Sequence, residues 1–414
     1  MQKIRINTLM LWIFVVFFFS YQFVLRLTPG VLIDEIMYKY NINASTFGLI
    51  SAFYYVGYAG MQIPIGALLD KYGVRYVVAT GAIICSLGNI LMLVSDYWVV
   101  ALVGRLLIGI GSAAGALGAI QAVRLNFSRK HMSKMIGFTI TISLLGAIYG
   151  KSINRFLYNY WGVEDSIIYL SIPGVIIALG ILLFTRDSKY EKDLDSAKHS
   201  VWLSLKEVFS NKQILWIAAA GALMVGPLGA FADIFGEPYF VHVYGFTPQK
   251  AGYLSASAIY FGFCIGAPLL AAIAERFNNY YNINIVCGFV MTIAFHLVLE
   301  KLVVGYNLMF ICMFIVGIMC AYQVIVISTA IDLVPVSLNG ITVAVVNMFN
   351  MTAGMLFNTG IGSLLDYYWT GDFVDGKMAY SDVAYTDALY ILPVTCMFGA
   401  ILFFVLKPSE DISN

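Results

Sequence analysis

Gly66-Ala-Leu-Leu-Asp70-Lys71-Tyr72-Gly73-Val74-Arg75 lies where one strongly apolar segment ends and another begins. The glycines permit a positive φ angle and a close approach of neighbouring backbones. The acid and the bases between them can join the ends of neighbouring helices through charge-assisted hydrogen bonds. A second, degenerate copy of this motif ends a later apolar segment: Ala271-Ala-Ile-Ala-Glu275-Arg276-Phe-Asn278, in which both glycines are replaced. We interpret the intact copy as a tight cytoplasmic turn between two membrane helices.

Composition places this turn in a membrane protein. The chain has 414 residues, of which 60% are hydrophobic and 11% are charged. Soluble globular domains carry about 25% charged residues. We therefore expect an all-α, multi-pass protein whose main partner is the lipid bilayer. The formal net charge is +1, so the charge balance indicates no nucleic-acid partner.

Neither cysteine nor histidine usage indicates a metal or cofactor site. The six cysteines all lie in apolar runs without metal-ligand spacing, and the four histidines are scattered. Buried thiols are the expected result. We predict no metal and no cofactor.

Twelve apolar segments approach the roughly 20 residues that a helix needs to cross a bilayer. They cover residues 9–33, 46–69, 76–95, 98–121, 133–154 and 166–185, then 213–236, 249–274, 282–300, 305–330, 340–364 and 387–406. The first run follows Lys3 and Arg5, but it is too long for a cleaved signal peptide. We interpret it as an uncleaved first helix.

The two halves of the chain resemble each other. Gly48-Leu-Ile-Ser51-Ala52 recurs as Gly252-Tyr-Leu-Ser255-Ala256, and Asp70 recurs at Glu275, at offsets of 204 and 205 residues. Such a repeat predicts two pseudo-symmetric six-helix bundles, related by an axis along the membrane normal, with a site between them. We expect bundles over residues 1–185 and 213–414, joined by a charged cytoplasmic linker over 186–212 with a short helix near Trp202–Phe209.

The distribution of basic residues predicts the orientation. Most lysines and arginines fall on one side if both termini are cytoplasmic, as the positive-inside rule requires. The segment from Arg124 to Lys130 is the clearest inside loop, and residues 366–387 form the longest outside loop.

The intact loop is similar to the signature loop of the major facilitator superfamily. Arg105-Leu-Leu-Ile-Gly109-Ile-Gly111 resembles the family's arginine-glycine motif in the fourth helix, which is often linked to proton coupling. The resemblance covers nearly the whole chain. It implies a twelve-helix secondary transporter that works by alternating access and is usually a monomer.

Within this family the chain resembles bacterial nutrient importers, including the phagosomal nutrient transporters of intracellular pathogens. The stretch Tyr21-Gln22-Phe-Val-Leu-Arg26-Leu-Thr-Pro-Gly30 and the short linker carry that resemblance. It implies a bacterial inner-membrane protein that takes up amino acids or similar small metabolites. Family exporters usually carry a glycine-proline motif in helix five, whereas residues 137–150 contain glycines and no proline. This favours import over the alternative, a drug or siderophore exporter by proton antiport.

Arg26 is the sharpest candidate substrate-binding residue. It stands about 25 Å along the first helix from Leu9, at a rise of about 1.5 Å per residue. An embedded arginine costs at least about 2.5 kcal/mol, so it must meet a cavity or a partner. Its planar fork can grip a substrate carboxylate, with Gln22 one turn away. The alternatives are snorkelling to the outer interface or pairing with nearby Asp34 or Glu35.

Two further charged residues are candidates for proton coupling. Asp233 lies in the outer half of helix seven, where burial and a neighbouring cation act on its protonation in opposite directions. The alternatives for it are a salt bridge to Arg26 across the bundles or a helix-end charge. Glu237 precedes Pro238 and is expected to end that helix. Arg105 either acts on a nearby acid or the substrate, or serves as a structural hydrogen-bond hub of helix four.

Polar side chains on shared helix faces complete the candidate pocket, either as substrate hydrogen-bond partners or as contacts that hold helices together. They are Tyr55, Tyr58 and Gln62 in helix two, Tyr260, Tyr322 and Gln323, and Asn347 and Asn350 in helix eleven. Lys151 either lines the cavity mouth or, more commonly for such a lysine, snorkels.

Together these features predict a secondary active transporter that imports a small polar, carboxylate-bearing solute, an amino acid or short peptide, by proton symport. Gly66, Asp70, Lys71, Gly73 and Arg75 would form a cytoplasmic gate. A membrane-embedded enzyme or a nutrient sensor is a third possibility. The sequence offers no clustered nucleophile, metal-ligand set, phosphate loop or sizeable signalling domain in support of either.

Overall fold

The computed structural model describes residues 6–127, 129–185, 201–277, 279–335, 338–374 and 377–407. Its α-helices are α1 (Ile6–Val31), α2 (Ile33–Tyr40), α3 (Ala44–Leu91), α4 (Trp98–Asn126), α5 (Arg129–Phe184), α6 (Val201–Ser210), α7 (Lys212–Leu223), α8 (Gly236–Tyr244), α9 (Pro248–Gly252), α10 (Ala258–Phe277), α11 (Tyr280–Leu299), α12 (Tyr306–Cys320), α13 (Tyr322–Ile331), α14 (Asn339–Tyr367), α15 (Asp382–Leu389) and α16 (Ile391–Leu406). Two π-helices are η2 (Pro227–Phe235) and η3 (Tyr253–Ser257). Two short strands, β1 (Phe373–Val374) and β2 (Lys377–Met378), pair antiparallel.

Ten helical stretches of the described chain are long and apolar enough to cross a membrane. Two of these stretches each contain two consecutive crossing helices joined at a glycine. α3 is broken at Gly73 (φ 80°, ψ 165°) and α5 at Gly162 (φ 76°, ψ 179°). Counting each half, the described residues contain the twelve crossing segments that hydropathy predicts, and the all-helical membrane fold is confirmed.

The backbone conformation of Gly73 explains why the signature loop has a glycine at this position. A positive φ angle costs little for glycine and is strained for other residues. The chain therefore reverses at the second glycine of the loop, as the sequence predicts. Gly66 differs, because a Cβ atom placed there would meet open space in the described structure. The expectation that Gly66 allows close backbone approach is wrong for this structure.

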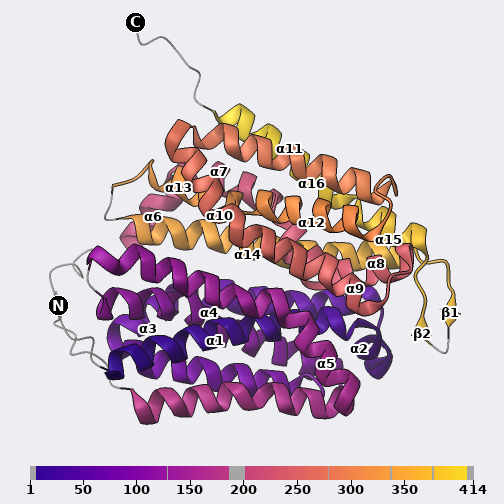
Figure 1. Ribbon diagram of the computed structural model, residues 1–414, viewed down its shortest axis with the longest axis horizontal. Coiled ribbons are helices and arrows are strands. Elements are labelled where there is room, and N and C mark those ends of the chain that lie inside the picture. The colour runs from indigo at the N-terminus through magenta and orange to yellow at the C-terminus, as the bar shows by residue number, and fades with distance from the viewer. Residues whose placement is uncertain are drawn as a thin grey trace, which may run out of the picture. The chain divides into compact units, whose positions relative to one another are not determined.

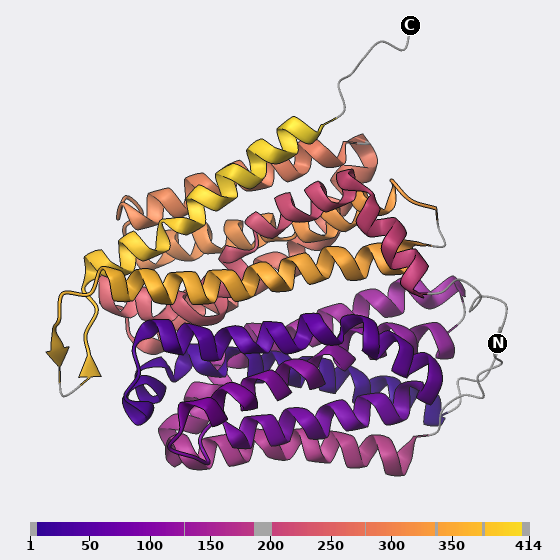
Figure 2. The ribbon, with the colours of Figure 1, turned by 180° about the vertical axis from the view of Figure 1, so that it is seen from behind.

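The described chain forms two compact units. The first comprises Met1–Lys192, Phe231–Ser257 and Gly354–Ala388, and the second comprises Asp193–Ala230, Ala258–Ala353 and Leu389–Asn414. In the first unit, α1, α3, α4 and α5 pack side by side (Figure 1), and α9 and η3 pack on α5. In the second unit, α11 packs on α16 and α10 on α12 (Figure 2). The predicted bundle boundaries stay a prediction, and residues 186–200 of the linker lie outside the described residues.

The seventh crossing segment departs from a simple helix. The predicted span over residues 213–236 lies within a single crossing stretch, Lys212–Tyr244. The stretch is longer and less regular than predicted, because α7 ends at Leu223 and the chain continues as η2 and α8 to Tyr244. Pro227 lacks the N–H group that a regular α-helix requires there. Glu237 therefore lies in the first turn of α8 and does not end the helix, contrary to expectation.

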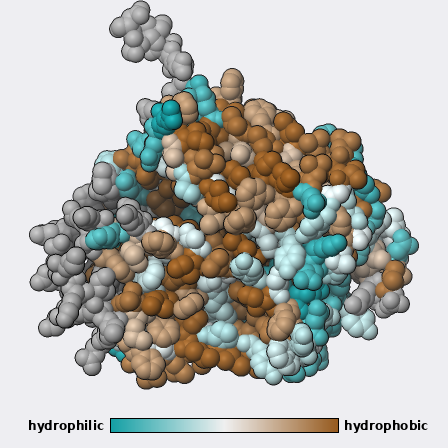
Figure 3. Space-filling view, viewed as in Figure 1, coloured by the Kyte–Doolittle hydropathy of each residue, from teal (hydrophilic) through white to brown (hydrophobic). Residues whose placement is uncertain are grey.

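Large apolar side chains cover the outside of the helices. Figure 3 shows apolar residues over most of the visible face along the helices, with hydrophilic residues gathered toward helix ends. Phe17 is 55% exposed and Leu183 is 71% exposed. Apolar exposure on this scale is typical of lipid-facing surfaces and not of a soluble monomer.

Candidate functional site

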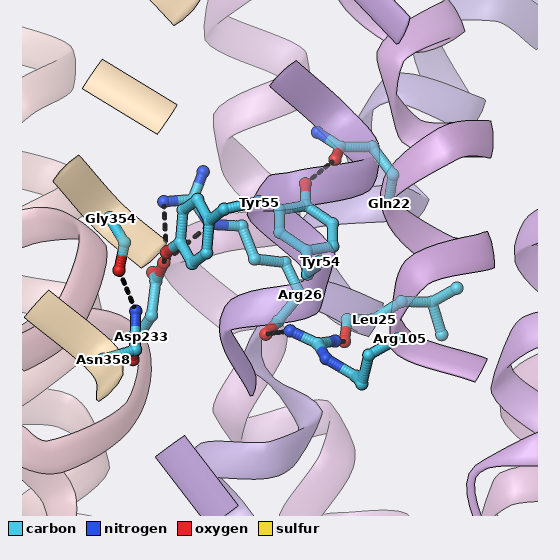
Figure 4. A network of polar contacts seen from close by, with 9 residues as sticks. All are labelled: Gln22, Leu25, Arg26, Tyr54, Tyr55, Arg105, Asp233, Gly354 and Asn358. Atoms are coloured by element: carbon cyan, nitrogen blue, oxygen red, sulfur yellow. Dashed lines mark hydrogen bonds and ion pairs between the residues drawn. The ribbon is translucent and has the colours of Figure 1, made fainter. Parts of the chain in front are cut away.

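A buried ion pair lies at the centre of the candidate site. Arg26 Nε donates to Asp233 Oδ2 at 2.6 Å. Arg26 is 9% exposed and Asp233 is fully buried. The Tyr55 hydroxyl donates to the same carboxylate oxygen at 2.8 Å and accepts from Arg26 Nη2 at 3.3 Å (Figure 4). Arg26 therefore pairs with Asp233 and not with Asp34 or Glu35. The salt bridge to Arg26 that was one alternative for Asp233 is present, with both residues in the first unit.

Three residues of the first unit, carried by three different elements, form this network. α1 carries Arg26, α3 carries Tyr55, and the π-helix η2 carries Asp233. Gly30 lets α1 approach η2, because a Cβ atom at that position would run into the Asp233 carbonyl oxygen and lie 2.9 Å from Ile234 Cα. The π-helix is rare and occurs often at functional sites. Its presence here supports a functional origin for the irregular backbone.

Arg105 holds the backbone around Arg26 in place. Arg105 on α4 donates from Nη1 to the Leu25 carbonyl at 3.1 Å and from Nη2 to the Arg26 carbonyl at 3.5 Å. Its guanidinium also lies 5.0 Å from the centre of the Tyr54 ring. The geometry matches the structural-hub alternative for Arg105. A direct role in proton coupling stays a prediction.

The remaining candidates of the first unit lie on α1 (Gln22) and α3 (Tyr58 and Gln62). The Tyr54 hydroxyl donates to Gln22 Oε1 at 2.9 Å, and the Tyr54 and Tyr58 rings lie 5.9 Å apart. Gln62 is buried one turn beyond Tyr58, and its Nε2 has no hydrogen-bond partner among the described residues. An unsatisfied buried amide costs stability unless a ligand or water completes it. Gln62 therefore has capacity to donate to a bound solute.

The other candidate pocket residues belong to the second unit. Tyr260 is buried, and the Tyr322 hydroxyl donates to the Gly221 carbonyl at 2.7 Å, which ties α13 to α7. In the part of the chain that the structure describes, Gln323 Nε2 and Asn350 Oδ1 have no hydrogen-bond partner. Asn347 is half-buried on α14.

The signature loop makes a specific contact within the first unit. Arg75 Nη2 donates to the carbonyl of Leu182 near the end of α5. Asp70 and Lys71 are exposed, and Lys71 Nζ lies 4.9 Å from the Tyr72 ring centre. The contact ties the loop to α5, and the gating role of these residues stays a prediction.

Sequence reasoning missed a second charged cluster in the first unit. Lys151 is buried, with Nζ 3.5 Å from Glu237 Oε2 and 3.2 Å from Ser255 Oγ. Arg155 Nη2 also donates to Glu237 Oε1. The expectation of a snorkelling lysine is therefore wrong. Lys151 and Arg155 are four residues apart, which places two cations on one helix face. That spacing was the available signal, since two embedded cations require an acid.

A multi-span helical protein with buried charge pairs has the architecture of a membrane transporter. The family profile of the Major Facilitator Superfamily matches residues 10–358. The chain therefore belongs to this family and is a secondary transporter, not an enzyme.

Relatives with curated names extend the comparison. The chain is 21% identical over 247 residues to the uncharacterized transporter YybO of Bacillus subtilis, covering 56% of this chain and 57% of that protein. It is 24% identical over 245 residues to the chloramphenicol resistance protein CraA of Acinetobacter baumannii, covering 57% of each chain. These alignments span little more than half the length of either relative.

The likeness to solved structures extends over nearly the whole chain. A bacterial homologue of the human lysosomal transporter Spinster, in an inward-facing and unoccupied conformation, matches with a TM-score of 0.71 and 17% identity. The match covers 97% of this chain and 96% of that one. At this identity the likeness establishes the fold alone.

Proposed function

We propose that this transporter imports a small solute carrying a carboxylate and an ammonium group, an amino acid or short peptide, by proton symport through alternating access. The buried Arg26–Asp233 pair is the observation that supports the proposal. A guanidinium fork matches a carboxylate in shape and charge.

The same pair supplies a physical basis for coupling. While Asp233 is ionised, its Oδ2 atom is paired with Arg26 Nε at 2.6 Å, and the guanidinium is then less available to a solute carboxylate. Protonation removes the negative charge and leaves Arg26 as a buried, poorly compensated cation, which is strongly unfavourable. A solute carboxylate relieves that cost. Proton and solute therefore favour each other's binding, and loss of the proton inside the cell restores the ion pair and releases the solute.

Other residues supply hydrogen bonds in this proposal. In the first unit these are Gln22, Tyr55, Tyr58 and Gln62. In the second unit, Gln323 and Asn350 have amide atoms without partners among the described residues, which suits them to a solute. Asn347 and Tyr260 are further candidates there. Tyr322 is less suited, because its hydroxyl already donates to Gly221.

The proposed setting is the bacterial inner membrane, with both termini in the cytoplasm and the chain acting as a monomer. Asp70, Lys71 and Arg75 would then lie on the cytoplasmic side and contribute to a gate. The Arg75 contact with Leu182 supports this role, because it links the loop to a neighbouring helix end.

Proton-driven export of a drug or siderophore is the second candidate. The similarity to a chloramphenicol resistance protein favours it. Against it, the first half of α5, residues 129–161, contains no proline. The two functions differ in the direction of solute movement.

A thermal-shift screen of the purified protein tests the proposed substrate class. We expect amino acids or dipeptides to raise the unfolding midpoint, because a ligand at about 100 times its Kd stabilises by about 2.7 kcal/mol. Arg26→Ala should abolish this shift, whereas the matched control Arg124→Ala, at an exposed position, should preserve it. Shifts with nucleosides alone, or an unchanged shift in Arg26→Ala, would exclude the carboxylate clamp.

A further inference from the structure

A cavity lies in the first unit, beside the cluster of Lys151, Arg155 and Glu237. It has a volume of about 450 Å³. Its lining includes these three charged residues together with Asn159, Thr247 and Gln249. We propose that this cavity binds the carboxylate group of a small solute, at a site separate from the Arg26–Asp233 pair.

The charges of the cavity favour an anion. Among its lining residues, two cations face one carboxylate. The Lys151 and Glu237 side chains are 3% and 4% exposed, and the Arg155 side chain is 21% exposed. A buried group of charges with one cation in excess is costly to maintain. One further carboxylate balances it.

The cavity also has unused hydrogen-bonding capacity. A guanidinium carries five N–H donors and an ammonium three. Arg155 contacts Glu237 through Nη2, and Lys151 contacts Ser255 and Glu237. A second carboxylate can take the other edge of the Arg155 fork, as arginine commonly binds carboxylates bidentately. The amide and hydroxyl groups of Asn159, Gln249 and Thr247 can then meet the polar groups of the solute.

Glu237 is a built-in competitor at this site. Its Oε1 accepts from Arg155, and Oε2 has no hydrogen-bond partner in the described chain and only the 3.5 Å ion pair with Lys151. A solute carboxylate must share both cations with it. Removing the Glu237 charge should therefore raise the affinity for the anion, whereas removing the Arg155 charge should lower it.

This site is distinct from the central pair although Asp233 and Glu237 are four residues apart. Asp233 pairs with Arg26 on α1, whereas Glu237 pairs with Lys151 and Arg155 on α5. The two carboxylates belong to consecutive turns of one chain segment and form ion pairs with different cations, although the Asp233 charge also acts on Lys151. Loss of one site therefore leaves the other set of contacts in place.

Opposite responses of two variants test the proposal. The probe is sodium acetate, exchanged against sodium chloride at constant ionic strength, with the unfolding midpoint of the purified full-length protein as readout. We expect Arg155→Gln to weaken the apparent acetate affinity by at least about tenfold, the scale of a lost charge-assisted contact. We expect Glu237→Gln to strengthen it severalfold. Arg26→Ala should leave the Arg155-dependent part of the acetate response intact, which separates this site from the proposed transport site.

Three outcomes would overturn the proposal. Equal loss of the response in Arg155→Gln and Glu237→Gln would mean that the cluster is a structural ion network. Loss in Arg26→Ala with retention in Arg155→Gln would assign acetate binding to the central pair. A response to inorganic phosphate without one to acetate would exclude a carboxylate ligand and indicate a phosphate-type anion. If Arg155→Gln does not elute as a folded species, Arg155→Lys keeps the charge, removes the fork and should show a weaker acetate response.

Discussion

Arg26 and Asp233 are ionisable side chains in apolar helices that form a buried ion pair. The pair is joined at 2.6 Å, and the Tyr55 hydroxyl bonds to both partners. Sequence alone marks both residues as unusual, because embedded charges are rare and functional in membrane proteins. It leaves their pairing as one of several alternatives, since the two residues are separated by 207 positions.

Asp233→Asn tests the coupling at the residue scale. Asparagine keeps the shape and removes the charge and the exchangeable proton, so we expect solute exchange to persist while proton-driven accumulation is lost. One proton per solute sustains at most about a tenfold gradient per pH unit. In proteoliposomes with an imposed pH gradient, the variant should therefore only equilibrate the solute. Asp96→Asn, at an exposed position, is the matched control and should accumulate it normally.

Helix contacts at the element scale determine where the charged residues meet. α1 approaches η2 at Gly30, and α4 is tied to α1 by Arg105. The seventh crossing segment changes from α7 to a π-helix and then to α8 within one span. Hydropathy predicts the span but not this change, because a π-helix has the same apolar composition as an α-helix. Pro227 and its neighbouring glycines were the local indication of an irregular backbone.

Gly30→Ala tests the importance of the close approach between α1 and η2. A methyl group at this position would collide with the Asp233 carbonyl, which is backbone and cannot rotate away. Overpacking of this kind costs about 1–3 kcal/mol. We expect a lower unfolding midpoint and weaker solute binding. Gly60→Ala on α3 meets open space and should leave both unchanged. Equal effects of the two variants would contradict this account.

The family assignment rests on the whole molecule. Twelve crossing segments, the break at Gly73 and a family match over residues 10–358 agree with one another. The fold leaves the direction of transport open, because the same fold serves many solutes and both directions of movement. In the proposed function, the charged pairs restrict the chemistry of the solute more than the fold does.

The direction of transport is a prediction at this scale. We expect right-side-out vesicles to accumulate the solute when the outside is acidified, because the proton gradient then drives symport inward. Inside-out vesicles acidified within should not accumulate it. Accumulation in inside-out vesicles acidified within would support proton antiport and replace the import proposal with the exporter alternative.

The sequence by itself determined the membrane class, the twelve crossing segments and the turn at Gly73. These features depend on local properties, namely the length of apolar runs and the backbone freedom of glycine. Only the tertiary structure decided that Arg26 pairs with Asp233 and that Lys151 is buried against Glu237. Such pairings join residues far apart in the chain, and their distances follow from how the helices pack. A one-dimensional pattern shows that an embedded charge needs a partner, but the packing selects which one.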